Sequence, residues 1–180
     1  MRRLTVHKVS GNSMRLWWKL KNPLRTTFNF KLIYIARFFP STRVKNFLYR
    51  TCGAKIGKGV TFGLGALIDI FYPELISVGD ETLIGYNTVL LGHEYLQEEY
   101  RTGRVDIGKR VMIGANCTIL PGIKIGDKAS ISAMSLVNCD IPSGQKWGGI
   151  PAARLRQATL GQQRRSPLAT RRTLRARRLK

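Results

Sequence analysis

Large aliphatic side chains recur at every sixth residue over a long stretch of the chain. The unbroken series is Ile107, Ile113, Ile119, Ile125, Ile131 and Val137. A small residue follows most of these positions, as at Gly108, Gly114, Gly126 and Ser132. A β-strand repeats every two residues and an α-helix every 3.6, so neither element alone explains a period of six. The period predicts short extended segments joined by corners, wound into a prism whose interior the aliphatic side chains fill.

The same period continues upstream in two further blocks. The first consists of Ile56, Phe62 and Ile68, and the second of Val78, Ile84 and Leu90. A short insertion separates the two blocks, and a longer one, residues 92–104, separates the second block from Ile107. Insertions in a repeat array lie on one side of it and often carry function. We therefore expect the longer insertion to mark a functional site.

Residues 14–50 interleave apolar and basic side chains, with paired tryptophans at Trp17 and Trp18. No apolar run is long enough to cross a bilayer. The pattern predicts two amphipathic helices separated near Pro40, with Ser41 as the N-cap of the second. Two roles stay open and are compatible: contact with an anionic membrane surface, or a cap over the open edge of the prism and packing on neighbouring subunits. Residues 1–13 are expected to be loose, without a secretory signal.

The charge is concentrated at the two ends of the chain. The net charge is +21, and residues 1–68 hold fourteen Lys or Arg and no acid, while residues 150–180 hold ten and no acid. Strongly basic ends suit an anionic partner, although a solvated tail is the favoured interpretation of the C-terminus. We expect residues 1–52 to form a basic helical extension, residues 53–156 the repeat domain, and residues 157–180 a disordered tail.

The cysteines and histidines argue against a metal centre. Cys52, Cys117 and Cys139 lack CxxC spacing, and the only histidines are His7 and His93. No cluster has the spacing of metal ligands, so we expect no bound metal. Unpaired cysteines indicate a reducing compartment. We expect a cytoplasmic protein, with peripheral contact to the inner face of the membrane as an option.

A candidate site follows from the geometry of the prism. One turn of a three-sided prism takes three hexads, about eighteen residues. With the short insertion added, Asp69 should lie directly beneath Leu91, two residues from His93. Imidazole is the natural base for a hydroxyl near neutral pH. An adjacent carboxylate can orient either the ring or an acceptor's hydroxyl, so this corner is the predicted site.

Four motifs carry a resemblance to a known family. They are Ile113-Gly114-Ala115-Asn116, Ile119-Leu120-Pro121-Gly122, Ile125-Gly126-Asp127 and Gly149-Ile150-Pro151-Ala152. Together they resemble the hexapeptide-repeat acyltransferases, most closely the maltose, galactoside and xenobiotic O-acetyltransferases, over roughly residues 53–156. The resemblance implies an all-β fold, a left-handed parallel β-helix with an N-terminal α-helical extension. It also implies a homotrimer with active sites between subunits and acetyl-CoA as acyl donor.

The resemblance also assigns residues by position. His93 is similar to the family's catalytic base, which deprotonates the acceptor for direct attack on the thioester. Asp69 is similar to an acceptor-binding acid, and Glu94 and Tyr95 stand in the inserted loop as further candidates for substrate binding. The groove for pantetheine is matched by Met112, Ala115, Ala133 and Asn138, and the phosphate-binding end by Gly148, Gly149, Arg154 and Arg156. The chain departs from the family at Ala153, where a basic residue is usual.

These features predict an acyl-CoA-dependent O-acyltransferase that moves an acetyl group to a hydroxyl of a sugar or polysaccharide precursor. A carbonic anhydrase of the same fold is excluded, because one histidine in the repeat body cannot supply three zinc ligands. The alternative is a non-enzymatic β-helical scaffold whose basic ends bind membrane or nucleic acid. If the protein is the predicted enzyme, we do not expect it to bind nucleic acid.

Overall fold

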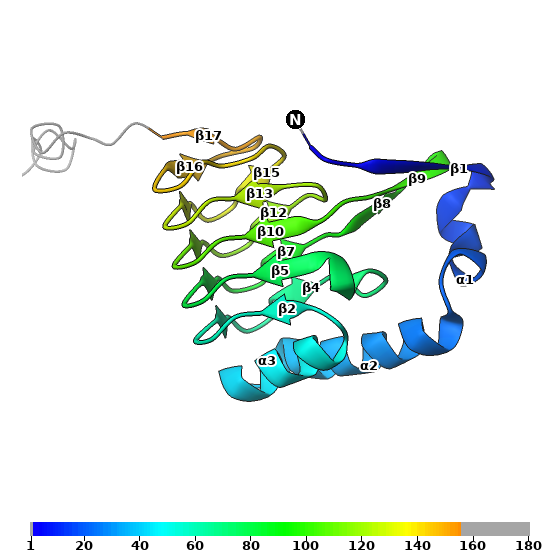
Figure 1. The fold of residues 1–180 in the computed structure, drawn as a ribbon, viewed down its shortest axis with the longest axis horizontal. Coiled ribbons are helices and arrows are strands. Elements are labelled where there is room, and N and C mark those ends of the chain that lie inside the picture. Colours follow the sequence, from blue (N-terminus) through cyan, green and yellow to red (C-terminus); the bar gives the residue numbers. More distant parts are fainter. Residues whose placement is uncertain (1, 156–180) are drawn as a thin grey trace, which may run out of the picture.

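Three flat faces wind around a common axis and form a column that stands on two helices (Figure 1). The computed structural model describes residues 2–155. The predicted disordered tail, residues 157–180, lies outside the described residues, as does Arg156.

The three faces of the column are parallel sheets of very short strands. Face 1 contains β2 (Lys55–Ile56), β5 (Ile76–Val78), β10 (Val105–Ile107) and β13 (Lys124–Ile125). Face 2 contains β3 (Thr61–Phe62), β6 (Leu83–Ile84), β11 (Met112–Ile113), β14 (Ser130–Ile131) and β16 (Lys146–Gly148), with β17 (Ala153–Arg154) antiparallel on its last strand. Face 3 contains β4 (Leu67–Ile68), β7 (Val89–Leu90), β12 (Thr118–Ile119) and β15 (Leu136–Val137).

The predicted hexads are the inward positions of this column. On face 3, Ile68 pairs with Leu90, Leu90 with Ile119, and Ile119 with Val137. All four side chains are fully buried. Burial of such a side chain contributes about 1.5–3 kcal/mol. The predicted ladder of aliphatic side chains is thus confirmed, and the architecture is the left-handed parallel β-helix that the resemblance implied.

The corners explain why small residues follow the aliphatic ones. Successive corners approach so closely that a Cβ on Gly85 would lie 2.5 Å from the carbonyl carbon of Gly114. No side chain fits at that separation, because the contact is with backbone that belongs to the next coil. The glycines therefore set the rise of the column.

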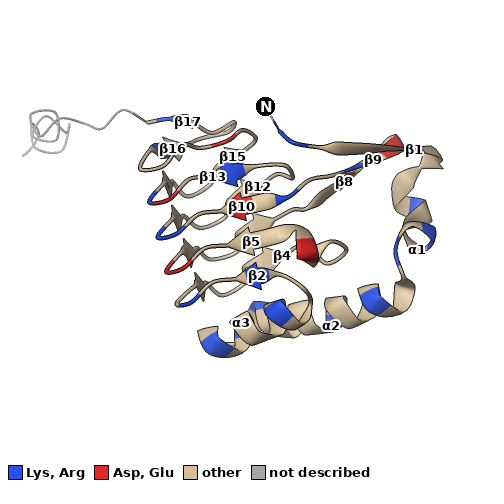
Figure 2. Cartoon of the chain, in the orientation of Figure 1, with Lys and Arg blue, Asp and Glu red and all other residues tan. Residues whose placement is uncertain are grey.

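Two helices close the lower end of the column. They are α2 (Pro23–Phe38) and α3 (Thr42–Thr51), preceded by η1 (Ser13–Leu16) and α1 (Trp17–Leu20). Ser41 holds the N-cap position of α3 as predicted, although its side chain makes no capping hydrogen bond. None of the helices in residues 2–155 is long and apolar enough to cross a bilayer. Basic side chains and no acidic ones mark both α2 and α3 (Figure 2).

Side chains of α3 satisfy the open edge of the first coil. The buried Lys45 Nζ donates to the carbonyls of Phe62 (3.2 Å) and Gly63 (2.9 Å). Further donors are Asn46 Nδ2 to Val60 O (2.8 Å), Tyr49 Oη to Ala66 O (2.9 Å) and Arg50 Nε to Ile56 O (2.9 Å). An unpaired strand edge would otherwise expose these acceptors. The capping role predicted for this segment is confirmed.

The expectation that residues 1–13 are loose is wrong. Thr5–Asn12 form β1, which pairs antiparallel with β9 (Gln97–Thr102), and β9 pairs in turn with β8 (His93–Tyr95). The long insertion folds into a hairpin whose outer edge has free backbone groups, and the N-terminus covers that edge. The pairing of β1 with β9 leaves no periodic signal in the sequence, because the two strands lie about ninety residues apart in the chain.

Candidate active site

Asp69 and His93 meet at the corner where face 3 ends, as the prism geometry predicted. The register of β4 and β7 pairs Ile68 with Leu90, so Asp69 lies one coil beneath Leu91. The long insertion begins directly after that corner and brings His93 back over it. The Nδ1 atom of His93 lies 2.5 Å from Oδ2 of Asp69.

The carboxylate of Asp69 is enclosed and accepts five hydrogen bonds. Oδ1 accepts from the backbone N–H groups of Phe71 and Tyr72, both at 2.9 Å. Oδ2 accepts from the N–H groups of Gly92 (2.7 Å) and His93 (3.1 Å) and from the imidazole of His93. The short insertion supplies the first pair of donors and the long insertion supplies the others.

This geometry defines which nitrogen of His93 can act as a base. A carboxylate that only accepts hydrogen bonds requires Nδ1 to carry the proton, which leaves the lone pair on Nε2. The side chain of Asp69 is 0 % exposed, and its contacts orient the imidazole. Contact between Asp69 and an acceptor stays a prediction.

Aromatic rings surround the imidazole, whose side chain is 13 % exposed. Ring centroids lie 4.5 Å away for Tyr95, 5.2 Å for Phe71 and 5.4 Å for Tyr72. Trp17 of α1 packs edge-on against Phe71 at 5.8 Å. Close packing on several sides restricts rotation of the ring and leaves only a small part of it exposed.

The hydroxyl of Tyr95 is buried and has no hydrogen-bond partner among the described residues. Burial, and then the negative charge of Asp69, raise the pKa of this phenol to about 12. The group therefore stays protonated near neutral pH and is available as a donor beside the imidazole. A buried polar group without a partner is costly, and such groups concentrate at functional sites.

The N-terminal strand fixes the hairpin that carries His93. Arg2 Nη1 lies 2.6 Å from Oε1 of Glu94, and the ring of His7 stacks on Tyr100 with centroids 4.4 Å apart. Glu94, expected to bind substrate, is thus engaged by Arg2. Arg2, which precedes β1, thus contacts β8, and His7 in β1 contacts β9, so the N-terminal segment holds both strands of the hairpin.

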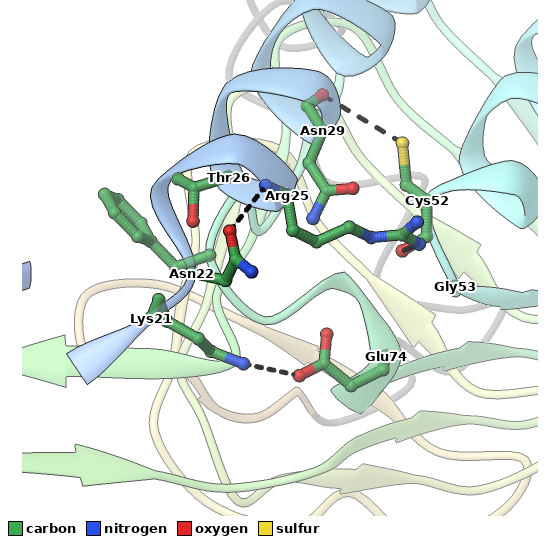
Figure 3. Close-up of a pocket in the computed structure, with 9 residues that line it drawn as sticks. Lys21, Asn22, Arg25, Thr26, Asn29, Cys52, Gly53 and Glu74 are labelled. Carbon is green, nitrogen blue, oxygen red and sulfur yellow. Dashed lines mark hydrogen bonds and ion pairs between the residues drawn. The ribbon is translucent and has the colours of Figure 1, made fainter. Parts of the chain in front are cut away.

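A cavity of about 340 Å³ lies between the start of α2 and the short insertion (Figure 3). Its walls include Lys21 and Glu74, which form a 2.8 Å ion pair, and the buried Asn29, whose Oδ1 has no partner among the described residues. Phe71 lines the cavity and also contacts His93. Charged and amide groups of both polarities suit a polar ligand with several hydroxyl groups better than an apolar one.

The residues assigned to the donor groove do not all lie at the corner of His93. Most of them lie on face 2 or on the corner between faces 2 and 3: Met112, Ala115, Ala133, Gly148, Gly149 and Arg154. The carbonyl of Ala115 accepts a hydrogen bond from the N–H of Met134. This contact places Ala133 one coil above Ala115. Asn138 follows β15 and shares the corner of His93.

Three known proteins and one family model are similar to this chain. Residues 104–135 match the model described as a hexapeptide repeat of succinyl-transferase. YvoF of Bacillus subtilis (strain 168), provisionally named an acetyltransferase, is 52% identical over 153 residues, which cover 84% of this chain and 89% of YvoF. The galactoside O-acetyltransferase of Escherichia coli (strain K12) is 32% identical over 117 residues, 61% of this chain and 58% of that enzyme. An acetyltransferase of Vibrio cholerae, VCA0836, solved with acetyl coenzyme A, superposes with a TM-score of 0.58 at 20% identity over 76% of this chain and 88% of that one.

The similarity to YvoF extends over most of both chains and decides the family. This chain belongs to the hexapeptide-repeat acetyltransferases. The similarity to VCA0836 supports the fold of this acetyltransferase, because so low an identity carries architecture alone.

The sequence of this acetyltransferase predicted the dyad and missed its surroundings. The period of six placed Asp69 near His93, whereas the aromatic neighbours Phe71 and Tyr72 lie in an insertion without any period. The contact of Arg2 with Glu94 depends on the unpredicted strand β1. Within residues 2–155, no group of three His, Cys, Asp or Glu side chains is placed to hold a metal ion.

Proposed function

We propose that the protein transfers the acetyl group of acetyl-CoA to a hydroxyl group of a sugar or polysaccharide precursor, with His93 as general base. The observation that carries the proposal is the dyad, in which Nδ1 of His93 lies 2.5 Å from Oδ2 of Asp69. An ionised carboxylate there favours the tautomer with the proton on Nδ1 and the lone pair on Nε2. The names of two similar proteins support the donor and the acceptor class: one acts on galactosides and one was solved with acetyl coenzyme A.

The reaction follows from the free lone pair on Nε2. His93 takes the proton of the acceptor hydroxyl as the oxygen attacks the thioester carbonyl, and the C–O bond of the new ester forms. The tetrahedral intermediate collapses with cleavage of the C–S bond, and the imidazolium returns the proton to the departing thiolate. Asp69 stabilises the transient positive charge on the ring. The products are the acetyl ester and the free thiol of coenzyme A.

The proposed donor site spans two subunits of a homotrimer. Met112, Ala115 and Ala133 lie on face 2 or its corner with face 3, away from the corner of His93. A neighbouring subunit that presents this surface to His93 would complete the site, with backbone groups along small side chains contacting pantetheine. Arg154, and Arg156 beyond the described residues, suit the nucleotide phosphates because guanidinium groups bind phosphate bidentately.

A screen of acceptors tests the proposed reaction. Release of the free thiol from acetyl-CoA is measured with a panel of sugars, amino sugars and oligosaccharides. The expected result is acceptor-dependent, saturable thiol release, together with a rise in melting temperature on addition of coenzyme A. Absence of both effects would contradict the enzyme and favour the non-enzymatic scaffold.

Subunit mixing tests the shared site. The variants His93→Ala and Ala115→Trp should each be nearly inactive as pure trimers, the first without a base and the second with a blocked groove. Unfolded together and refolded, they should recover about a quarter of the parental activity, because random assembly restores that share of interfaces. A monomeric mass in solution, or no recovery on mixing, would contradict a site between subunits.

A further inference from the structure

The outer face of α2 has no part in the acetyl transfer proposed above. The helix buries Thr26, Asn29, Ile33 and Ala36 as one stripe against the column. Residues on the opposite stripe follow the same helical spacing and point away from the column: Leu24, Phe28, Lys31, Ile35 and Phe38. Four of these five side chains are apolar, whereas a solvent-facing stripe is normally polar.

The exposure of this stripe is large. Leu24 is 83 % exposed, and Ile35 and Phe38 are 53 % and 52 % exposed. Tyr34 joins it through contacts with Phe30 and Phe38, each at 5.7 Å between ring centroids, and Phe47 of α3 is 65 % exposed. We define the basal face as the α2 residues Leu24, Phe28, Lys31, Tyr34, Ile35 and Phe38. Single exposed apolar residues are ordinary, but a contiguous group on one element indicates an interaction surface.

The charge around the basal face has one sign. Residues 2–68 contain no acidic residue, and α2 and α3 together carry only basic charge (Figure 2). Lys31 in α2 and Arg43 in α3 are exposed and form no ion pair or side-chain hydrogen bond within residues 2–155. Apolar rings flanked by free lysine and arginine are the composition of helices that lie in a membrane interface.

We propose that the basal face docks the enzyme on an anionic phospholipid surface, with α2 parallel to the membrane plane. The helix has 16 residues, a length of about 24 Å, and together with α3 it ends the column (Figure 1), so a flat surface can approach both helices from below. Its apolar side chains would enter the headgroup region while Lys31 and Arg43 contact lipid phosphates.

Two features favour lipid over other occupants. The carbonyls of the first coil are already satisfied by α3, so the lower end is not an open edge that requires another strand. Binding of nucleic acid depends on phosphate contacts from basic side chains and gains nothing from aliphatic residues such as Leu24 and Ile35. Lipid uses both the charge and the apolar surface.

Flotation of the full chain with vesicles tests the proposal. Vesicles of phosphatidylcholine alone are compared with vesicles that also contain phosphatidylglycerol. The triple variant Phe28→Ser/Ile35→Ser/Phe38→Ser should partition at least about tenfold more weakly than the parent, since interfacial binding scales with buried apolar area. The matched control is Val6→Ser, whose side chain is 50 % exposed in β1, away from the helices, and it should float like the parent.

Charge is tested separately with Lys31→Ala/Arg43→Ala. Each basic group near an anionic surface contributes about fivefold to binding, so this variant should lose about 25-fold on phosphatidylglycerol vesicles and little on phosphatidylcholine. Salt at about 1 M should weaken the parent in the same way. Thermal melts of all variants establish that they are folded.

Three outcomes would overturn the proposal. The first is equal flotation of the triple variant and the parent, which would assign any lipid binding to another part of the chain. The second is a molecular mass that rises with protein concentration in the parent but not in the triple variant, which would make the basal face a contact between copies. The third is binding to nucleic acid without binding to vesicles. None of these readouts uses acetyl-CoA, so they are independent of the proposed reaction.

Discussion

Replacement of Asp69 by asparagine separates the two tasks of its carboxylate. The side chain accepts from two N–H groups on each side, at Phe71 and Tyr72 and at Gly92 and His93, and also from the imidazole. An amide oxygen can replace only one carboxylate oxygen, and the amide N–H₂ would face the donors on the other side. At least two buried backbone donors therefore lose their partner in Asp69→Asn.

The magnitude follows from these lost hydrogen bonds. Each orphaned donor costs about 1–3 kcal/mol, so unfolding should become easier by about 2–6 kcal/mol. For a chain of this size that corresponds to a fall in melting temperature of about 4–24 °C. If the amide nitrogen faces His93, it donates to Nδ1, and the ring must move its proton to Nε2, which removes the base. The activity should then fall by about 10²–10⁴.

Thermal melts and thiol release measured on Asp69→Asn check both effects. The matched control is Asp127→Asn, which removes a carboxylate that caps the exposed N–H of Lys109 at another corner. This control should remain close to the parent in both assays. A melting temperature within about 2 °C of the parent, together with activity within a few-fold, would refute the reasoning for Asp69.

Three further predictions concern the N-terminal strand, the phenol beside the dyad and the end of α3. Gly122→Ala should detach β1, because Gly122 has φ +79° and an added Cβ would lie 2.6 Å from the carbonyl oxygen of Arg3. Detachment would appear as faster proteolysis near the N-terminus than in the control Gly144→Ala, where φ is +71° and no atom lies near the added Cβ. Equal cleavage of the two variants would contradict this prediction. Tyr95→Phe removes a hydroxyl that has no described partner, so stability should stay within about 1 kcal/mol while kcat/KM for the acceptor falls about tenfold, and unchanged kinetics would exclude this phenol from acceptor binding. Burial raises the pKa of Cys52 to about 11 from the ordinary 9.0. The stability contributed by the neutral thiol is therefore full below pH 9.0 and should be lost as the pH rises through about 11. In chemical unfolding, the free energy of unfolding of Cys52→Ala should fall less steeply over this pH range than that of the parent, and an identical fall would contradict the effect of burial.

The period of six was sufficient to predict the column and the meeting of its two key side chains. Residues such as Ile119 and Val137 are inward because every hexad contacts only the hexads above and below it. The position of Asp69 beneath Leu91 then follows by counting residues. Capping by α3 was also predictable, because an open strand edge requires a cover.

The rest depends on contacts between segments that have no period. Phe71 and Tyr95 reach His93 from two different insertions, and His7 reaches Tyr100 from the N-terminus. The role of Asp69 was left open because either orientation of a carboxylate is compatible with the same position in the sequence. The five donors around it, which only the structure shows, support a role in orienting the ring.

The kcat of His93→Ala is the decisive measurement for the proposal that Nε2 of His93 takes the proton of the acceptor. The affinity for acetyl-CoA, measured by calorimetry, and the melting temperature should stay close to those of the parent, because the imidazole is not part of the proposed donor groove. Loss of the base should lower kcat by about 10²–10⁴. A variant that binds acetyl-CoA normally and turns over within a few-fold of the parent would contradict it.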